Sequence, residues 1–178
     1  MGKQGKLTVA LIIFVAFPLL SLIMVYAAIK DDPHFPQSFM AGGLTNMRGE
    51  DGLTNFEREH GFGPIEKEVK LSFLPDEKLA ETGAKIFKMK CSACHKLGKQ
   101  YVGPALRGIT NFRSPTYIMN MILNPKGMTQ QHPVAKGLLE QYMRDMSPQG
   151  MDETSARAVV EFLRWDFEKS QQATGAMD

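Results

Sequence analysis

The first apolar pattern in the chain is a run without formal charge from Leu7 to Ile29. As a helix its 23 residues would be about 35 Å long, enough to cross a bilayer core of about 30 Å. Pro18 interrupts the run, which membrane helices tolerate. Two lysines precede the run and two aspartates follow it, so the positive-inside tendency predicts that the remainder of the chain is extracytoplasmic. The sequence therefore predicts a single transmembrane anchor over residues 1–30.

A cleaved signal peptide is the alternative for this segment, with Val25-Tyr26-Ala27 as a passable cleavage site. The apolar run is longer than the roughly 7–15 residues usual in such peptides, which favours a retained anchor. Both interpretations place the bulk of the chain outside the cytoplasm.

Residues 76–170 alternate apolar and polar positions with a helical period in four segments. The segments begin near Asp76, Pro115, Pro133 and Asp152, and the last continues to about Lys169. The first leads into Cys91, the second ends at Asn124-Pro125, and the third places Val134, Leu138 and Tyr142 on one face. The last carries one apolar stripe: Ala156, Val159, Val160, Leu163 and Phe167. No strand pattern is visible, so we expect an all-α domain followed by a flexible tail over residues 171–178.

Residues 31–75 show no sustained period and contain six glycines and four prolines. This connecting arm nevertheless carries several phenylalanines, and a purely solvated linker is poor in such residues: Phe35, Phe39, Phe56, Phe62 and Phe73. We expect the arm to pack in part on its own globular domain or on a membrane-bound partner. A loosely ordered strap is the alternative.

Composition narrows the function classes. With 178 residues, the chain can hold one ordinary domain and its appendages. A formal charge of +2 does not predict the strongly basic face that nucleic acid requires. The chain has only two cysteines, three positions apart, in the stretch Cys91-Ser-Ala-Cys94-His95.

Three roles for this stretch are poorly supported. A structural zinc site needs two further ligands, but no cysteine remains and His34, His60 and His132 form no ligand-like pair. A thioredoxin-type dithiol is expected in a βαβ context, which is absent. A disulfide would close a very small loop, stabilise little and leave the histidine unexplained.

The pattern C-x-x-C-H is the one used for covalent attachment of haem c. The two thiols add to the two vinyl groups of the porphyrin, and the histidine that follows is placed to ligate the iron. The stretch therefore predicts one covalent haem c, bound through Cys91, Cys94 and His95.

The surrounding residues resemble the class I cytochrome c family over about residues 76–168. The resemblance begins with Gly83, Phe87 and the haem-binding stretch, continues through Gly103-Pro104-x-Leu106-x-Gly108, and closes with the run Val159–Leu163. It implies an all-α class I cytochrome c fold of about four helices around one haem, here preceded by the transmembrane helix.

Two further roles follow from this resemblance. In the family, a glycine allows the first and last helices to cross closely, which here would pair Gly83 with Phe162. A proline carbonyl accepts a hydrogen bond from the haem-ligating histidine, so Pro104 would orient His95 and strengthen it as a ligand. An incidental helix glycine and a plain turn proline are the alternatives.

The sixth iron ligand in the family is a methionine in the loop before the last helix. Met143, Met146 and Met151 lie in this region. Met146 precedes Ser147-Pro148 at the expected distance and is the predicted ligand, with Met143 as the next candidate. Met151 stands where the family usually has a packing leucine. Met128 and His132 are less favoured, and His132 resembles a capping residue before Pro133.

The resemblance implies an electron carrier rather than an enzyme, with no small-molecule substrate. We expect a membrane-anchored monohaem cytochrome in a bacterial respiratory chain, with its haem domain on the periplasmic side of the inner membrane. The phrases SPTYIMNMILNP and HPVAKGLLEQYM resemble anchored cytochromes associated with nitrous-oxide reduction. A quinol-oxidising complex would then be the donor and a periplasmic or membrane reductase the acceptor.

Other functions remain open at this point. The chain could be an integral subunit of a nitric-oxide reductase, a terminal oxidase or a quinol-oxidising complex. A haem-based sensor or peroxidase would need an iron ligand that leaves. Five lysines near the attachment stretch suggest docking to acidic partners, although lysine-rich helix surfaces are common: Lys85, Lys88, Lys90, Lys96 and Lys99.

Overall fold

The computed structural model describes residues 48–175. The predicted anchor and the first part of the arm lie outside the described residues. Within the described range, none of the helices has the length and apolarity needed to cross a bilayer. Contacts group the described residues as one compact unit.

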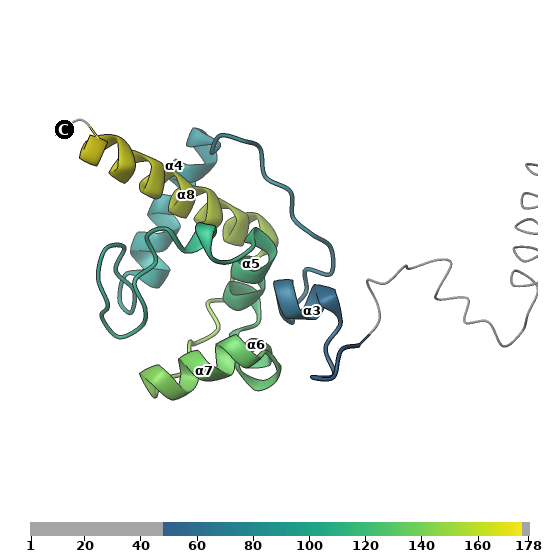
Figure 1. Ribbon diagram of the computed structural model, residues 1–178. Coiled ribbons are helices and arrows are strands. Elements are labelled where there is room, and N and C mark those ends of the chain that lie inside the picture. The colour runs from purple at the N-terminus through teal and green to yellow at the C-terminus, as the bar shows by residue number, and fades with distance from the viewer. Residues whose placement is uncertain (1–47, 176–178) are drawn as a thin grey trace, which may run out of the picture. The chain divides into compact units, whose positions relative to one another are not determined.

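The unit is built from helices and contains no strand between residues 48 and 175, as the sequence predicted. Its elements are α3 (Asn55–His60), α4 (Glu77–Ile86), a π-helical turn η2 (Phe87–Cys91), a 3-10 turn η3 (Ile109–Asn111), α5 (Pro115–Leu123), α6 (Pro125–Gln131), α7 (Pro133–Tyr142) and α8 (Glu153–Gly175). Figure 1 shows α4 crossing α8 at one end of the unit, α6 and α7 at the other, and α5 between them.

Three of the four predicted helices, α4, α5 and α8, begin at a residue whose side chain caps them. The Asp76 carboxylate accepts from Leu79 N–H, and Ser114 Oγ accepts from Tyr117 N–H ahead of Pro115. Asp152 caps α8 by accepting from Ser155 N–H at 2.7 Å. α8 does not end near Lys169 but continues to Gly175, so the prediction of a flexible tail was wrong for residues 171–175.

Two helices were not predicted. α6 was missed because Asn124-Pro125 was interpreted only as a helix end. Asn124 in fact closes α5 and opens α6, since its side chain accepts from Gly127 N–H and proline suits the first helical position. α3 begins with a capping box in which Thr54 and Glu57 each accept a hydrogen bond from the other's backbone N–H.

The second part of the arm packs on the globular domain, which confirms that expectation for the described residues. Ile65 is buried in the main core, and its N–H donates to Asn120 Oδ1 of α5 at 3.0 Å. Asn120 Nδ2 donates in turn to the carbonyls of His60 and Ile65. Val69 N–H donates to Thr116 Oγ1 at 2.7 Å, also on α5. The arm is therefore fastened to the outer side of α5 by buried side chains.

The junction between the arm and α4 is held by a buried carboxylate. Glu161 of α8 is inaccessible to solvent and lies between Arg157 and Arg164, at 3.1 and 2.8 Å. Arg164 also donates to the carbonyls of Ser72 and Phe73. Removing one partner of such a pair leaves a buried charge uncompensated, which typically costs about 3–5 kcal/mol. This cluster fixes the point at which the arm enters the first long helix.

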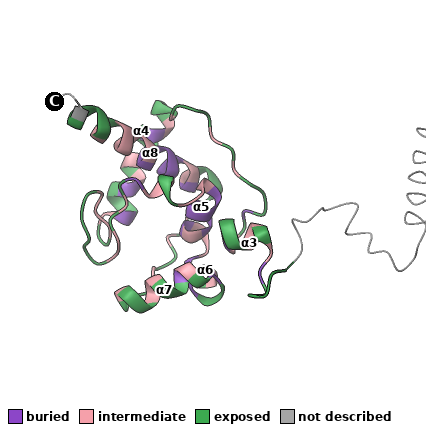
Figure 2. Cartoon of the chain, viewed as in Figure 1, coloured by how far each residue is buried: buried purple, intermediate pink, exposed green. Residues whose placement is uncertain are grey.

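The core lies along α8 and is continuous with α4 and α5 (Figure 2). The rings of Phe87 and Phe162 are 5.3 Å apart where α4 and η2 meet α8. Gly83 lies at this crossing, as predicted. A Cβ on Gly83 would lie 1.9 Å from the Ala158 carbonyl oxygen and 2.9 Å from Phe162 Cβ, so the backbone of α8 is an even closer neighbour than the predicted aromatic.

We expect Gly83→Ala to destabilise the protein by about 1–3 kcal/mol, because the carbonyl of Ala158 cannot yield without separating the two helices. This steric cost exceeds the gain of about 1 kcal/mol that alanine brings over glycine in a helix interior. Guanidinium unfolding of the purified protein measures the difference.

Gly137→Ala is the matched control, since Gly137 is in α7 with nothing within 4 Å of its added Cβ. It should be neutral or stabilise by up to about 1 kcal/mol. A Gly83→Ala protein as stable as the Gly137→Ala protein would show that the helices do not cross this closely.

Candidate functional site

The attachment stretch sits on a local widening of the first long helix. α4 continues into η2, where Ser92 N–H donates to the Phe87 carbonyl at 2.9 Å, five residues back. Such π turns are frequent at functional sites. The Cys91 carbonyl then accepts from the N–H groups of Cys94 and His95, at 3.0 and 2.9 Å. These bonds fold the five residues into a tight turn that presents both thiols and the imidazole together.

The state of the thiols argues against a dithiol redox centre. No disulfide joins the two cysteines; Cys91 is buried and Cys94 is exposed. Burial raises the pKa of the Cys91 thiol to about 11, so it stays protonated at neutral pH. A reactive dithiol needs the opposite shift, because the thiolate is the nucleophile.

A zinc site finds no support either. No group of three or more His, Cys, Asp or Glu side chains within residues 48–175 could hold a metal ion. His60 Nδ1 pairs with Ser114 Oγ at 2.7 Å, and His132 Nε2 pairs with the Arg58 carbonyl at 3.0 Å. His132 is the N-cap residue of α7, as the sequence suggested, although its side chain makes no capping hydrogen bond. Both histidines hold α3 against the domain.

The loop that follows His95 orients its imidazole ring, as the sequence predicted. Its Nδ1 lies 3.0 Å from the Pro104 carbonyl oxygen, so the ring donates there and leaves Nε2 available as a ligand. Gly103 contributes a role that the sequence did not reveal. A Cβ at this position would lie 2.6 Å from Cε1 of the imidazole, so only glycine lets the backbone pass against the ring.

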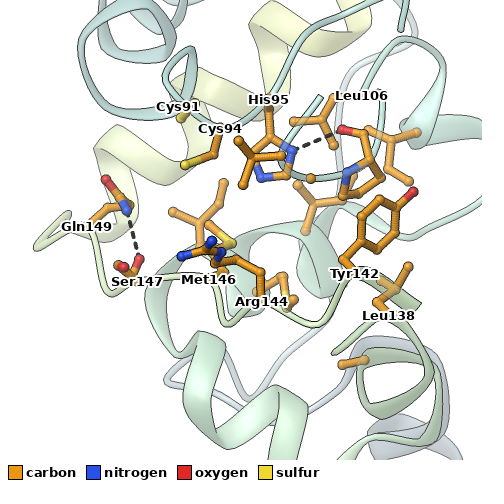
Figure 3. A pocket seen from close by; sticks show the side chains of 18 of the residues that line it. Cys91, Cys94, His95, Leu106, Leu138, Tyr142, Arg144, Met146, Ser147 and Gln149 are labelled. Atoms are coloured by element: carbon orange, nitrogen blue, oxygen red, sulfur yellow. Dashed lines mark hydrogen bonds between the residues drawn. The ribbon is translucent and has the colours of Figure 1, made fainter. Parts of the chain in front are cut away.

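The turn opens into a cavity of about 480 Å³, within the usual range for ligand sites of about 300–1,000 Å³. Most of its walls are aliphatic or aromatic side chains from α5, α7, α8 and the loops around them. They include Phe87, Val102, Leu106, Ile118, Met121, Ile122, Leu138, Leu139, Tyr142, Val159 and Leu163. Figure 3 shows Cys91 and Cys94 at one end, with His95 and Met146 pointing into the space from opposite sides.

The structure discriminates between the candidate methionines. Met146 lines the cavity and is half-buried, whereas Met143, Met151 and Met128 do not line it. Met143 follows the end of α7 in a left-handed conformation, with φ of 49°, and 84% of its surface is exposed. Met151 packs against the main core, and Met128 is buried in a second cluster, where its sulfur accepts from Phe62 N–H.

These residues fit a haem c. Two thiols stand beside one end of a mostly apolar cavity, a histidine with an oriented ring enters from one wall, and a thioether enters from the other. His95 and Met146 would hold the iron of a bound haem, and the apolar walls would exclude water from it. Polar wall residues were missed by the sequence, above all Tyr117 and Arg144. Nothing in their local pattern distinguishes them from an ordinary core tyrosine and a surface arginine.

The predicted lysines lie around the attachment stretch, and four of the five are exposed. Lys96 is half-buried: its ammonium donates to the Ser92 carbonyl and lies 4.9 Å from the centre of the Tyr101 ring. Lys90 donates to the Gln149 carbonyl at 2.8 Å and so links η2 to the loop between α7 and α8, which carries Met146. The rim near the thiols is therefore positively charged.

Comparison with known proteins gives the same assignment. A family model described as Cytochrome c matches residues 80–166. A cytochrome c from Rhodothermus marinus is 42% identical, with a TM-score of 0.60, over 64% of this chain and 97% of that chain. None of the curated protein sequences compared matches the chain.

Two further solved structures are of an engineered Rhodothermus marinus cytochrome c, Rma TDE. One is 41% identical with a TM-score of 0.60, and the other, bound to a carbene intermediate, is 42% identical with a TM-score of 0.58. Each comparison covers 63% of this chain and 96% of that one. The carbene belongs to the engineered protein. The attachment turn, the oriented histidine, the cavity and these similarities together show that the chain belongs to the class I cytochrome c family.

Proposed function

We propose that this cytochrome c is a membrane-anchored, monohaem electron carrier of a bacterial respiratory chain, with its haem domain on the outer face of the cytoplasmic membrane. Family membership already makes it an electron-carrying protein with one covalent haem c. The anchor and the location are supported by the uncharged run from Leu7 to Ile29 and by the charges that flank it.

The observation that carries the electron-transfer role is the pairing of His95 with Met146 across the cavity. The bound haem supplies a one-electron Fe(II)/Fe(III) couple. The chain offers the iron a ligand on each side and so leaves no position for a substrate. A soft thioether opposite an imidazole also favours the reduced iron and raises the reduction potential, as suits a carrier.

Carbon monoxide tests this role against that of a sensor or a peroxidase. We expect the reduced protein at neutral pH not to bind carbon monoxide, because Met146 holds the sixth position. Spectra of the reduced protein with and without the gas give the answer. Rapid and complete binding would mean that the position opens, in favour of a sensor or peroxidase.

The proposed partners are a quinol-oxidising complex as donor and a respiratory reductase as acceptor, with nitrous-oxide reductase as the specific proposal. The support is the resemblance of SPTYIMNMILNP and HPVAKGLLEQYM to anchored cytochromes of that pathway. Purification in mild detergent should retain such a partner. Co-purification with a nitric-oxide reductase or a terminal oxidase would instead identify the chain as a subunit of that complex.

Electron transfer to an acidic redox partner should slow as salt is added. The exposed lysines around the attachment turn attract such a partner, and salt weakens attraction between charges more than about 8–10 Å apart. Stopped-flow rates between about 0.01 and 0.5 M salt measure the slope. Lys88→Gln is expected to reduce that slope, since Lys88 is exposed beside the attachment turn. Rates that do not change with salt would exclude steering by this rim.

The anchor is tested by fractionation. The full chain should sediment with membranes and resist extraction by salt, whereas a chain expressed behind a cleavable leader and lacking residues 1–30 should be released in soluble form. Recovery of the full chain as soluble protein, with its N-terminus removed, would support the cleaved signal peptide instead.

A further inference from the structure

The loop that orients His95 lies largely on the surface of the unit. Residues 96–107 contain no helix or strand, and five consecutive residues, 98–102, are exposed. Figure 1 shows this loop projecting from the side of the unit. Pro104 is part of it, and its carbonyl oxygen lies 3.0 Å from His95 Nδ1. The orientation of the imidazole therefore depends on how the rest of the loop is held.

The two ends of the loop are paired by backbone hydrogen bonds. Leu106 N–H donates to the Lys96 carbonyl at 3.1 Å. Arg107 N–H donates to the Leu97 carbonyl at 2.9 Å. Leu97 and Leu106 also pack against the main core. Because the two ends are joined in this way, a displacement of Arg107 also displaces the residues that lead out of the attachment turn.

A bidentate ion pair fastens this base of the loop to α8. Arg107 Nε and Nη2 donate to the two carboxylate oxygens of Asp166, at 2.8 and 3.1 Å. In the described part of the chain, these are the only hydrogen bonds between residues 96–107 and α8. The Asp166 side chain is 14% exposed, so little water competes for it. Bidentate geometry and partial burial distinguish this pair from most surface ion pairs.

The backbone around Arg107 leaves room for this pair. A Cβ at Gly98 would lie 3.2 Å from Arg107 Nη1, so the guanidinium passes close over the start of the loop. Gly108 has a φ of 76°, and a Cβ there would lie 3.3 Å from the Phe167 ring of α8. The arginine is therefore held between the start of the loop and the last helix.

We propose that Arg107 and Asp166 are positioning residues for the haem-ligating histidine, acting through the base of the loop and the Pro104 carbonyl. The proposal rests on ligation of the iron by His95 and is independent of the membrane anchor and of the redox partners. The hydrogen bond at Nδ1 fixes the plane of the imidazole and strengthens it as a ligand. α8 would thus act on the iron through the backbone of the loop.

Proton NMR of the reduced holoprotein tests this role by hydrogen exchange at His95 Nδ1. Asp166→Asn and Arg107→Gln remove opposite charges but break the same pair. Both should speed the exchange by about three- to tenfold, the effect of losing one or two modest hydrogen bonds. An effect of charge alone would have opposite signs in the two variants. The amide of Val160, buried in α8, corrects for any change in global stability.

Glu168→Gln is the matched control. It removes the same charge as Asp166→Asn from the same helix, and Glu168 makes no hydrogen bond or ion pair within residues 48–175. Its exchange rate at His95 should equal that of the wild-type protein. The double variant with Arg107→Asp and Asp166→Arg should return the rate toward the wild-type value.

Unchanged exchange in both Asp166→Asn and Arg107→Gln would overturn the proposal, as would an equal effect of Glu168→Gln. A wild-type spectrum without an imidazole ligand would instead refute ligation by His95 itself. The native protein offers a test that needs no variant. With increasing denaturant, the amides of Leu106 and Arg107 should exchange through the same local opening as His95 Nδ1. Exchange of the imidazole proton that is independent of these amides would also overturn the proposal.

Discussion

Met146→Leu is expected to lower the reduction potential by on the order of 0.1–0.3 V, part of the roughly 0.8 V over which axial ligands move haem potentials. Leucine fills similar space in the half-buried position but offers the iron no electron pair. The oxidised protein should lose the weak charge-transfer band that marks sulfur ligation. The reduced protein should gain the ability to bind carbon monoxide. Voltammetry and absorption spectra measure these changes.

Met143→Leu is the control, because Met143 is three residues away, exposed, and outside the cavity wall. Its potential and spectra should match those of the wild-type protein. The opposite result, with the sulfur signature lost in Met143→Leu and kept in Met146→Leu, would require the loop between α7 and α8 to rearrange when haem binds.

Replacing the two cysteines, and so removing the thioether links to the haem, should have the second large effect, a loss of folded protein. Without the haem, the walls of a cavity of about 480 Å³ must collapse or admit water. If such a cavity stayed dry, the cost would be on the order of 10 kcal/mol, comparable with the whole stability of an ordinary domain. We therefore expect Cys91→Ala and Cys94→Ala to reduce sharply the yield of folded protein, and the double variant to abolish it.

The two single variants should not be equal. Cys91 is buried in the main core beside Phe87, whereas Cys94 is exposed, so Cys91→Ala also removes packing and should be the more severe. Ser92→Ala, inside the same turn, removes one hydrogen bond to the Lys88 carbonyl and should leave the yield nearly unchanged. Folded yield and the haem that remains on the polypeptide after acid and solvent extraction provide the measurement. Normal yield and retained colour in the double variant would contradict covalent attachment.

Most of the predicted site residues that the structure places around one cavity are close in sequence or belong to a local motif. Cys91, Cys94 and His95 share one turn, and Pro104 follows within a short loop that can only fold back on the histidine. Met146 could be chosen from its distance to the next helix, and its place in the cavity agrees with that choice. Local spacing was sufficient for Cys91, Cys94, His95 and Pro104 because little chain lies between them, whereas Met146 was chosen from its distance to the next helix.

Apart from α3, the parts that were missed depend on contacts across the fold or on one residue that serves two helices. Asn124 both ends α5 and caps α6, and the sequence alone suggested only the ending. Tyr117 looks like any apolar residue of α5 until the cavity that it lines is seen. The capping box of Thr54 and Glu57 was visible in the sequence and would have predicted α3.

α5 separates two layers, since one side lines the haem cavity and the other carries the arm through Thr116 and Asn120. The amide protons of Ile65 and Val69 are therefore indirect reporters of that wall, although neither residue binds the cofactor. Hydrogen exchange at these amides should follow the same opening event that lets solvent reach the macrocycle. A recombinant fragment beginning at residue 76 would lose the contacts of the arm with α5. Its haem cavity would therefore open to solvent more often than that of the longer chain.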